Sequence, residues 1–333
     1  MTGELMRAVR IHDWDTPPTL DEVPAPVPLP DETLVRMEAA AVAHLDLTVA
    51  SGKFGFKPEL PYVGGVEGCG TVVSSDVHPP GTRVMLRGGG LGLKRPGTWA
   101  ELVAVRTRSV SPVPAGLSPA VGATYFAPAT AAYTALHDVG RLGAWPVDGV
   151  RSAADEVVLV TGAAGAVGSM VVQLARRAGC TVIGTFGAKH RQTPDGVDAV
   201  RLDDGARSAR LRRDRPATLL VDTIGGPGLA SRSGWVRPGG RAVSVGYVAG
   251  TDAVLDLPNW LLDDVALLPV NMIRRESAAR GHAAMLTKLL VDGELTLAVE
   301  AFGMADAPRA LHLLATGGLQ GRGVLVPDRI VAP

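Results

Sequence analysis

The sequence predicts an α/β protein with two domains, one mostly β and one built on a doubly wound parallel sheet. In the N-terminal part, short runs of alternating apolar and polar residues are separated by Gly and Pro, as in antiparallel β-structure. After Glu156, short apolar runs alternate with helix-like stretches, which is typical of a parallel sheet covered by helices. The length of 333 residues agrees with two domains of about 150 residues each.

Four segments of the N-terminal part have the pattern of β-strands. Residues 34–38 alternate apolar and polar side chains, and similar runs follow at residues 70–74, 83–86 and 101–105. Turn-forming Gly and Pro residues separate these runs, for example at residues 88–90. We therefore expect a compact, mostly antiparallel β domain.

The rest of the chain alternates predicted helices and strands. Residues 118–136 are rich in Ala and predicted to be helical, with Pro128 as a break or kink. Further helices are predicted at residues 166–178 and 278–291. Strands of one parallel sheet are predicted at residues 157–160, 181–185, 219–222 and 241–245, and residues 323–326 form an apolar strand whose position allows a return to the first domain.

Composition excludes several classes of protein. The 33 basic and 33 acidic side chains balance, which argues against nucleic acid or an anionic membrane as a partner. Cys69 and Cys180 are too few for a disulfide framework or a four-cysteine zinc site, and we interpret them as small buried apolar residues. There is no apolar run of about 18 residues and no signal-peptide core, so we expect a cytoplasmic protein.

The strongest local signal is a glycine-rich turn between a predicted strand and a predicted helix. Gly162, Gly165 and Gly168 follow the apolar strand at residues 157–160. Such a turn lets the backbone approach a pyrophosphate, and the following helix offers free N–H groups and the positive end of its dipole. The context predicts a dinucleotide site, and the alternative is a tight strand–helix turn without a ligand.

The end of the second predicted strand indicates which dinucleotide is bound. An NAD site has Asp or Glu there to hold the ribose 2′-hydroxyl. This chain instead has Gly187, Lys189, His190 and Arg191, and the next acid is Asp195. A cationic cluster suits a 2′-phosphate, so we expect NADPH rather than NADH. The alternative is a solvated basic turn with no role in binding.

Together these motifs resemble the medium-chain dehydrogenase/reductase superfamily, in particular its zinc-free quinone oxidoreductase (zeta-crystallin-like) and enoyl reductase branch. The resemblance covers nearly the whole chain. Residues 62–72 are similar to the family segment Gly-x-Glu-x-x-Gly-x-Val, and residues 129–136 match its Ala-Thr-Ala-Ala-Tyr helix. Residues 222–226 and 238–246 are similar to its fourth and fifth cofactor-domain strands.

The resemblance implies a GroES-like, mostly β substrate domain made of residues 1–125 and 270–333. A Rossmann domain at residues 126–269 would bind NADPH, with the active site in the cleft between the domains. Family positions imply that the following residues meet the cofactor: Thr130, Gly162, Gly165, Ala166, Val167, Gly168, Gly187, Lys189, His190, Arg191, Thr223, Gly246, Tyr247 and Arg322.

The resemblance also implies that no catalytic zinc is bound. Ala43 and Val66 stand where zinc-dependent relatives have a Cys and a His. A catalytic zinc normally has three protein ligands. On paper His44, Asp46 and Glu67 offer an alternative set of ligand atoms, although we interpret Glu67 as a structural carboxylate within the β domain.

Without a metal, reduction of an activated C=C bond in a quinone, enone or enoyl substrate is the expected activity. Hydride would add to the β carbon, and hydrogen-bond donors would stabilise the charge that develops on the carbonyl oxygen. Ala43 and Phe54 occupy positions where family members usually carry Asn and Tyr. The resulting apolar cleft indicates a specialised substrate, aromatic or polyketide-like.

Candidate proton donors and pocket residues follow from these positions. The catalytic candidates are His44, Tyr62 and Tyr247, with water as an alternative proton source. The candidates for the substrate pocket are Phe54, Phe56, Tyr125 and Asn271. We expect the loops at residues 51–60, 86–98 and 259–275 to determine specificity.

Two other functions remain open, a zinc-free carbonyl or alcohol oxidoreductase and a non-catalytic NADPH-binding protein. The resemblance further implies a homodimer through edge strands of the cofactor domain, for which residues 241–245 or 254–257 are the candidates.

Overall fold

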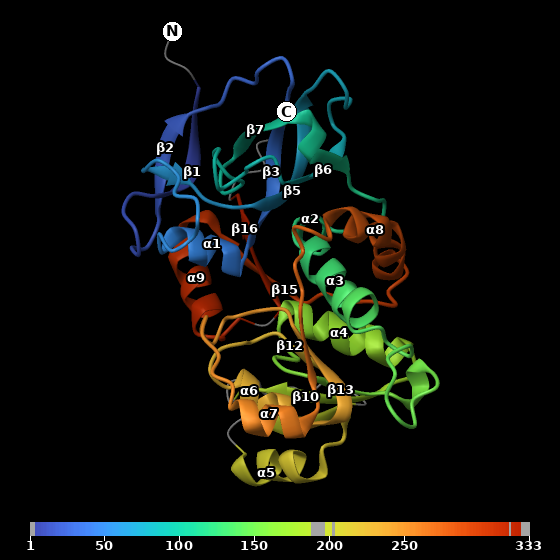
Figure 1. Cartoon of the computed structure of the whole chain (residues 1–333). Coiled ribbons are helices and arrows are strands. Elements are labelled where there is room, and N and C mark those ends of the chain that lie inside the picture. Colours follow the sequence, from blue (N-terminus) through green and yellow to red (C-terminus); the bar gives the residue numbers. More distant parts are fainter. Residues whose placement is uncertain (1–3, 188–196, 202–203, 320, 328–333) are drawn as a thin grey trace. The chain divides into compact units, whose positions relative to one another are not determined.

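The computed structural model describes residues 4–187, 197–201, 204–319 and 321–327 (Figure 1). The chain forms two compact units. Unit 1 comprises Met1–Tyr125 and Ala298–Pro333, and unit 2 comprises Phe126–Leu297. The chain therefore returns from unit 2 to unit 1 at Ala298, later than residue 270, where we expected this boundary. The reason is helix α8 (Glu276–Val291), which packs against α3 (Phe126–Tyr133) and stays with unit 2.

Unit 1 is mostly β, as its alternating pattern predicts. Its described residues form a seven-stranded sheet in the order β15-β16-β3-β5-β6-β8, with β7 also paired to β3, and a three-stranded sheet in the order β2-β1-β4. These strands are β1 (Leu5–Ile11), β2 (Thr19–Pro24), β3 (Glu32–Val42), β4 (Tyr62–Val63), β5 (Glu67–Ser74), β6 (Arg83–Arg87), β7 (Leu102–Arg106), β8 (Val110–Pro112), β15 (Val299–Gly303) and β16 (Arg322–Val326).

Each of the four strands expected in the N-terminal part overlaps an observed one, namely β3, β5, β6 or β7. The C-terminal strand β16 pairs antiparallel with β3, which confirms its return to the first unit. The same unit contains the short helices α1 (His44–Ala50), α2 (Pro119–Gly122) and α9 (Ala307–Ala315) and the 3₁₀ turns η1 (Thr107–Ser109) and η4 (Met304–Asp306).

The core of unit 1 is filled by aliphatic side chains and one large aromatic. Trp99 is almost completely buried, and its indole N–H donates to the carbonyl of Ala41 on β3 at 2.8 Å. Gly64 packs directly on this ring, since a Cβ there would lie 2.5 Å from Trp99 Cε3. The glycine-rich segment before β5 therefore gives the indole room to close the core.

Unit 2 contains a parallel sheet. Its described strands pair in the order β11-β10-β9-β12-β13-β14, and every neighbouring pair is parallel. The strands are β9 (Val157–Val160), β10 (Thr181–Phe186), β11 (Asp198–Arg201), β12 (Ala217–Asp222), β13 (Val236–Ser244) and β14 (Ala266–Pro269). Strand order reverses between β9 and β12, and ligands bind at the carboxyl ends of strands beside such a reversal.

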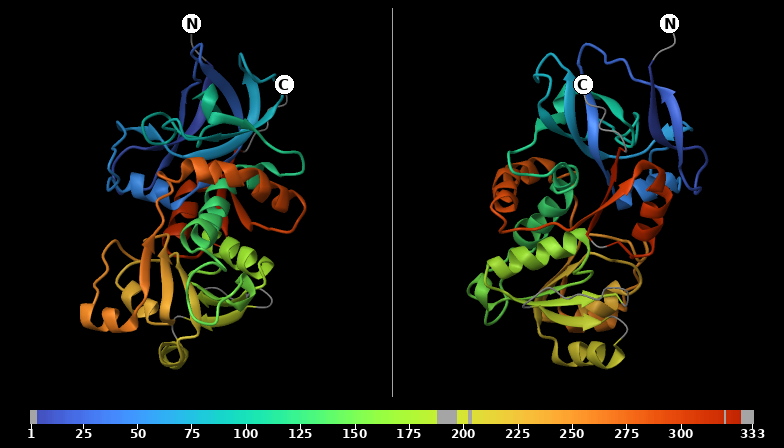
Figure 2. Two further views of the ribbon diagram at one scale, coloured as in Figure 1. Left: turned by 45° about the vertical axis from the view of Figure 1, so that its right-hand side comes forward. Right: turned by 180° about the vertical axis from the view of Figure 1, so that it is seen from behind.

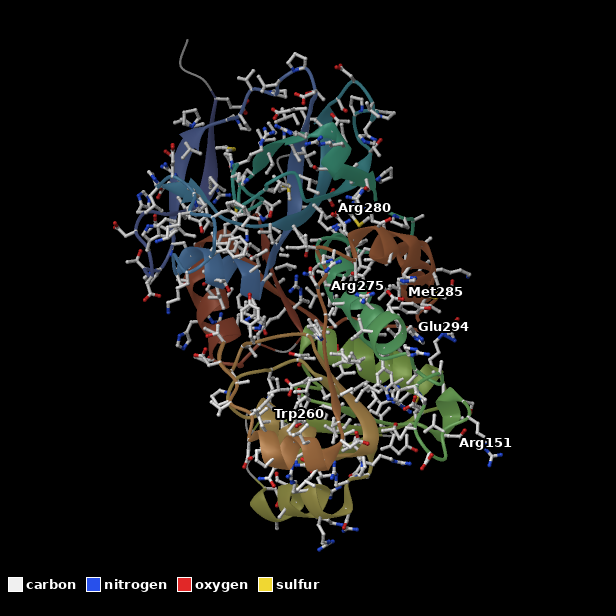
Figure 3. All side chains as sticks on the ribbon, in the orientation of Figure 1. Arg151, Trp260, Arg275, Arg280, Met285 and Glu294 are labelled. Carbon is white, nitrogen blue, oxygen red and sulfur yellow. The ribbon has the colours of Figure 1, made fainter. Side chains whose placement is uncertain are left out.

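Helices cover the sheet of unit 2 on both faces. Helix α4 (Ala166–Arg177) lies on one face and α5 (Gly205–Asp214) on the other (Figure 2). The remaining helical segments are the 3₁₀ turn η3 (Ala153–Asp155), α6 (Leu229–Ser233) and α7 (Leu257–Asp263). Trp260 of α7, labelled in Figure 3, donates its indole N–H to the carbonyl of Val265 at 2.9 Å, which fixes α7 beside the start of β14.

The expected helix at residues 118–136 is divided, although not at Pro128. Helix α2 ends at Gly122, α3 begins at Phe126, and a π-helical segment η2 (Thr134–Val139) follows. Pro128 lies in the first turn of α3, where a missing N–H leaves no helical hydrogen bond unmade. The interruption falls at residues 123–125 instead.

A buried ion pair ties β13 to the start of β9. Arg241 and Glu156 are both fully buried, and two hydrogen bonds of 2.7 Å join the guanidinium to the carboxylate. Since β13 lies between β12 and β14, residues 241–245 cannot form the sheet edge that we expected. Residues 254–257 lie outside the strands, so the two edge strands among the described residues are β11 and β14.

Candidate active site

The glycine-rich turn after β9 is built by close backbone contacts. Gly162 has a φ of +63°, which favours glycine. A Cβ on Gly168 would lie 2.1 Å from the carbonyl oxygen of Gly162, so a side chain at position 168 would push α4 away from the turn. These two glycines therefore set the packing of the helix against the strand.

Gly165 has a different role from its two neighbours. It is the N-cap of α4 with φ −72° and ψ 169°, a conformation open to any residue. A Cβ there would meet one atom, the Gly162 carbonyl oxygen, at 3.2 Å. A methyl group at position 165 would therefore need a small shift of the Gly162 carbonyl, far less than one at position 168, and its absence leaves space beside the backbone at the start of the helix.

The first turn of α4 supplies hydrogen-bond donors to that space. The N–H of Ser169 donates to the Gly165 carbonyl at 2.8 Å and makes the first intrahelical bond. The amides of Ala166, Val167 and Gly168 thus have no acceptor within the helix. With the positive end of the helix dipole, they fit the pyrophosphate of a dinucleotide.

The loops after β12 and β13 lie together at the same end of the sheet. The hydroxyl of Thr223 donates to the Thr161 carbonyl at 2.6 Å, and the Thr223 N–H donates to the Thr161 hydroxyl at 3.0 Å. A Cβ on Gly246 would lie 2.3 Å from the Thr223 carbonyl oxygen. Thr223 and Gly246 are therefore brought together as expected, and Tyr247 follows them with 57% of its surface exposed.

A buried ion pair that sequence reasoning missed holds the loop after β12. The Asp222 carboxylate accepts the N–H groups of Ile224 and Gly225 and pairs with Arg232 Nε at 2.6 Å. Arg232 also donates to the Gly225 carbonyl at 2.6 Å. The available signal was an acid directly after the apolar run at residues 219–221, since a buried charge requires partners.

The other expected cofactor residues of unit 2 are only partly described. Thr130 is buried in α3, and its hydroxyl donates to the Phe126 carbonyl at 2.7 Å, so the oxygen can only accept from a ligand. Gly187 follows β10 directly. Lys189, His190 and Arg191 lie outside the described residues, so the structure does not test the 2′-phosphate pocket.

In unit 1, a buried carboxylate fixes the start of α1. Asp46 is 3% exposed, and its carboxylate accepts the N–H of Ala43, the N-cap of this helix, at 2.8 Å. Burial raises the pKa of Asp46 to about 7, while the Ala43 N–H and the Arg322 cation act in the opposite direction. His44, the first residue of α1, is thereby held in a defined position.

The cation beside Asp46 also serves a second carboxylate. Arg322 Nη2 lies 3.3 Å from Glu67 Oε2, and Arg322 Nε donates to the Thr124 hydroxyl at 2.8 Å. Burial raises the pKa of Glu67, and Arg322 opposes this shift. The guanidinium thus pairs with Glu67 and acts on Asp46 through its charge. The contacts of Arg322, which we expected beside the cofactor, are those of a buried network in unit 1.

The two catalytic candidates of unit 1, His44 and Tyr62, are both uncharged at pH 7 and both carry a proton that they can donate. Desolvation and the Arg322 cation lower the pKa of His44, whose side chain is exposed on α1, so the ring is neutral at pH 7. Tyr62 is buried, and burial together with Asp46 raises the pKa of its hydroxyl. The Tyr62 phenol therefore keeps its proton and remains a donor.

The four candidates for the substrate pocket are distributed over both units. Phe54 packs against the core of unit 1, and its ring centroid lies 6.2 Å from that of Phe56. Tyr125 is buried at the end of the first segment of unit 1. Asn271 belongs to unit 2, and its side-chain oxygen accepts the N–H of Arg274 at 3.0 Å. Only Phe54 and Phe56 are thus brought together within one unit.

Comparison with known proteins gives consistent matches. Residues 29–115 match the alcohol dehydrogenase GroES-like domain. The chain is 26% identical to prostaglandin reductase-3 of Bos taurus over 86% of this chain and 77% of that protein. It is 26% identical to quinone oxidoreductase of Mus musculus over 74% and 75%, and 28% identical to acryloyl-coenzyme A reductase of Sulfurisphaera tokodaii over 83% and 86%.

A solved structure agrees with these relatives. A probable oxidoreductase from Mycobacterium abscessus superposes with a TM-score of 0.78 at 26% identity, covering 97% of this chain and 99% of that one. The chain belongs to the medium-chain dehydrogenase/reductase superfamily. It is an oxidoreductase, and membership implies a nicotinamide dinucleotide as cofactor, which the turn from Gly162 to Gly168 fits.

Positions 43 and 66 are where the resemblance implies that zinc-dependent relatives carry ligands. Ala43 and Val66 have no ligating atom. The described residues also contain no group of three His, Cys, Asp or Glu side chains able to hold a metal, so His44, Asp46 and Glu67 are not assembled as a ligand set.

No helix in the described part of this superfamily member is both long and apolar enough to cross a bilayer.

Proposed function

We propose that this oxidoreductase is an NADPH-dependent, zinc-independent reductase of an activated C=C bond in a quinone, enone or enoyl substrate. The observation that carries the proposal is the glycine-rich turn at the carboxyl end of β9, where Gly165 leaves space beside the free amides of α4. That arrangement provides for a pyrophosphate. When bound, the nicotinamide would supply a hydride to the β carbon of the substrate.

The residues of unit 1 support a role in stabilising charge. Addition of hydride to a conjugated C=C places negative charge on the carbonyl oxygen, and hydrogen-bond donors lower the energy of that charge. Tyr62 keeps its proton because burial raises its pKa, and neutral His44 carries one N–H. We assign these two side chains as candidate donors to that oxygen, with water as the other proton source.

NADPH is favoured over NADH by the residues after β10. Gly187 directly follows β10, at the position where an NAD site would have an acid. Lys189 and Arg191 come next in the sequence. Their cationic side chains match a 2′-phosphate.

The substrate class is supported by residues and by relatives. Ala43 and Val66 remove two ligand positions for a Lewis acid, on which reduction of a simple aldehyde would depend. Relatives named quinone oxidoreductase and acryloyl-coenzyme A reductase are named for conjugated acceptors. Phe54 makes the region around α1 apolar, which suits an aromatic or polyketide-like substrate.

The test is NADPH oxidation by the purified full chain with EDTA present. The acceptors are quinones, enones, enoyl thioesters and simple aldehydes, with NADH in parallel. We expect turnover with conjugated acceptors only, faster with NADPH and unchanged by EDTA. Turnover of aldehydes alone would instead identify a carbonyl oxidoreductase. Tight NADPH binding without turnover of any acceptor would identify a non-catalytic binding protein.

A further inference from the structure

A groove of about 1030 Å³ lies within unit 1 and shares no residue with the glycine-rich turn. Strands β1, β2 and β7 contribute Met6, Val23 and Leu102 to it. Residues 56–59, 61–63 and 93–97 also line it, and of these 56–59 and 93–97 belong to two loops that we expected to determine specificity. The volume lies just above the usual range for ligand pockets, about 300–1,000 Å³.

Apolar side chains at the groove are unusually exposed. Val27 is 86% exposed, Leu29 61% and Phe56 54%, and all three line it. Clustered apolar surface of this kind marks a binding site more often than single scattered residues do. A ligand with an apolar body would remove this surface from water.

The groove also has an excess of positive charge. Arg95 pairs with Glu32, and Arg10 Nη1 lies 3.4 Å from an oxygen of Asp21, so both arginines are neutralised. Lys57 and Lys94, which also line the groove, are not neutralised in this way.

Lys57 and Lys94 have no carboxylate within ion-pair distance among the described residues. Both ammonium groups lie over aromatic rings, Lys94 Nζ at 4.1 Å from the centroid of Phe56 and Lys57 Nζ at 5.9 Å from that of Trp14. One acid that lines the groove, Glu59, is likewise without a described ion pair. The two lysines therefore leave one positive charge in excess.

We propose that this groove binds an amphipathic carboxylate. Its apolar chain would contact the apolar lining residues, and its carboxylate would pair with Lys57 and Lys94. The concave shape of the groove favours a small molecule, since a flat basic and apolar surface would suit a membrane better. The groove is also lined by Phe56 and Tyr62, our candidates for the substrate pocket and for a proton donor, so the inference deepens the proposed function and rests on it for these two roles.

The test measures binding of dodecanoate and of dodecan-1-ol to the full chain by calorimetry, below their aggregation concentrations. The two probes share the alkyl chain and differ in charge. We expect Lys57→Ala/Lys94→Ala to weaken dodecanoate binding about tenfold and to leave dodecan-1-ol binding unchanged, which is the scale expected for two solvent-exposed ion pairs. Both lysines have solvent-accessible side chains, so the double variant keeps the fold.

Two further variants locate the site. Lys53→Ala removes an exposed lysine of the same loop that does not line the groove, and it should leave both affinities unchanged. Ala104 of β7 lines the groove, so the ring added by Ala104→Phe should weaken binding of both probes. Circular dichroism checks that each variant is folded.

Several results would overturn the proposal. One is absence of dodecanoate binding to the wild-type chain, and another is an equal loss in Lys53→Ala and in the double variant. Competition between dodecanoate and NADPH would place the alkyl chain in the cofactor site instead. Sedimentation with phosphatidylglycerol vesicles that is lost in the lysine variant, without binding of monomeric dodecanoate, would identify a membrane surface. None of these readouts depends on turnover, so failure of the reductase assay leaves this test intact.

Discussion

Arg322 Nη2 lies 3.3 Å from Glu67 Oε2, and this buried pair joins β16 to β5 across 255 positions of the sequence. The same cation faces Asp46, whose carboxylate fixes the first turn of α1. One guanidinium thus links the C-terminal strand, a central strand and the helix that begins with His44. Its removal affects all three at once.

Replacement of Arg322 by Met should be strongly destabilising. The variant leaves two buried carboxylates without a cation, and breaking a buried pair in this way costs about 3–5 kcal/mol. Urea unfolding monitored by circular dichroism measures the loss. Adding Glu67→Gln to Arg322→Met removes one of the stranded charges and should restore part of the stability. A loss below about 1 kcal/mol in the single variant would contradict the network.

The raised pKa of Asp46 predicts a particular pH dependence of stability. The carboxyl has a pKa of about 7 in the folded chain and 3.8 as its ordinary value, so between these two pH values the folded state holds a proton that the unfolded state has lost. Stability from this group is therefore full below about pH 4, falls as pH rises, and stays constant above about pH 7. The total change is at most about 4 kcal/mol.

Asp46→Asn isolates that contribution from the other carboxyls. Its amide oxygen still accepts the Ala43 N–H, and it does not titrate. The free energy of unfolding of the variant, minus that of the wild type, should increase from pH 4 to pH 7. A flat difference across this range would show that Asp46 has an ordinary pKa.

Gly165 and Gly168 form a matched pair for testing the turn. Gly165→Ala needs only a small shift of the Gly162 carbonyl but places a methyl group beside the amides of α4, so it should lose less stability than Gly168→Ala and weaken NADPH binding by about tenfold, or about 1.4 kcal/mol. Gly168→Ala should lower stability itself, because its Cβ would lie 2.1 Å from Gly162 O. Fluorescence titration and thermal unfolding separate the two effects.

The preference for NADPH should depend on Lys189 and Arg191, which lie outside the described residues. We expect Lys189→Ala/Arg191→Ala to raise the KM for NADPH about tenfold or more while the KM for NADH stays nearly constant, since only NADPH carries the 2′-phosphate. Steady-state kinetics with both cofactors measure the ratio. Parallel losses for the two cofactors would favour a general structural effect.

We also propose that the chain forms a homodimer through the β14 edge. Helix α7 beside this strand exposes apolar side chains, with Leu261 70% and Leu262 81% exposed. Such a surface next to an open strand edge is normally covered. Leu261→Glu/Leu262→Glu should convert a dimer to a monomer in analytical ultracentrifugation. Leu5→Glu, an exposed leucine in unit 1, is the control and should leave the dimer unchanged.

Much of the fold could be predicted from sequence because its signals are local. Alternation in residues 34–38 indicates a strand with two different faces, and the strand–turn–helix at residues 157–178 contains all the groups that form the phosphate-binding end. The contacts of Gly165 and Gly168 lie within seven residues and can be interpreted locally, whereas a Cβ on Gly162 would also meet the distant Thr223 Oγ1 at 2.7 Å.

Other features of the site required the tertiary structure. The second boundary was expected at residue 270, but packing of α8 on α3 places it at Ala298. The contacts of Arg322 with Glu67 and Thr124 were not predicted, and its expected place beside the cofactor stays a prediction. The order in which the strands pair likewise places β14 at that edge of the sheet, where we had expected residues 241–245.

The sequence by itself determined the class of fold, the turn that receives a dinucleotide and the absence of ligating atoms at positions 43 and 66. Tertiary structure decided the partners of Arg322, the protonation of Asp46 and the groove with Lys57 and Lys94. The physical reason is that burial and charge balance depend on which distant segments meet, and residue type alone does not fix those contacts.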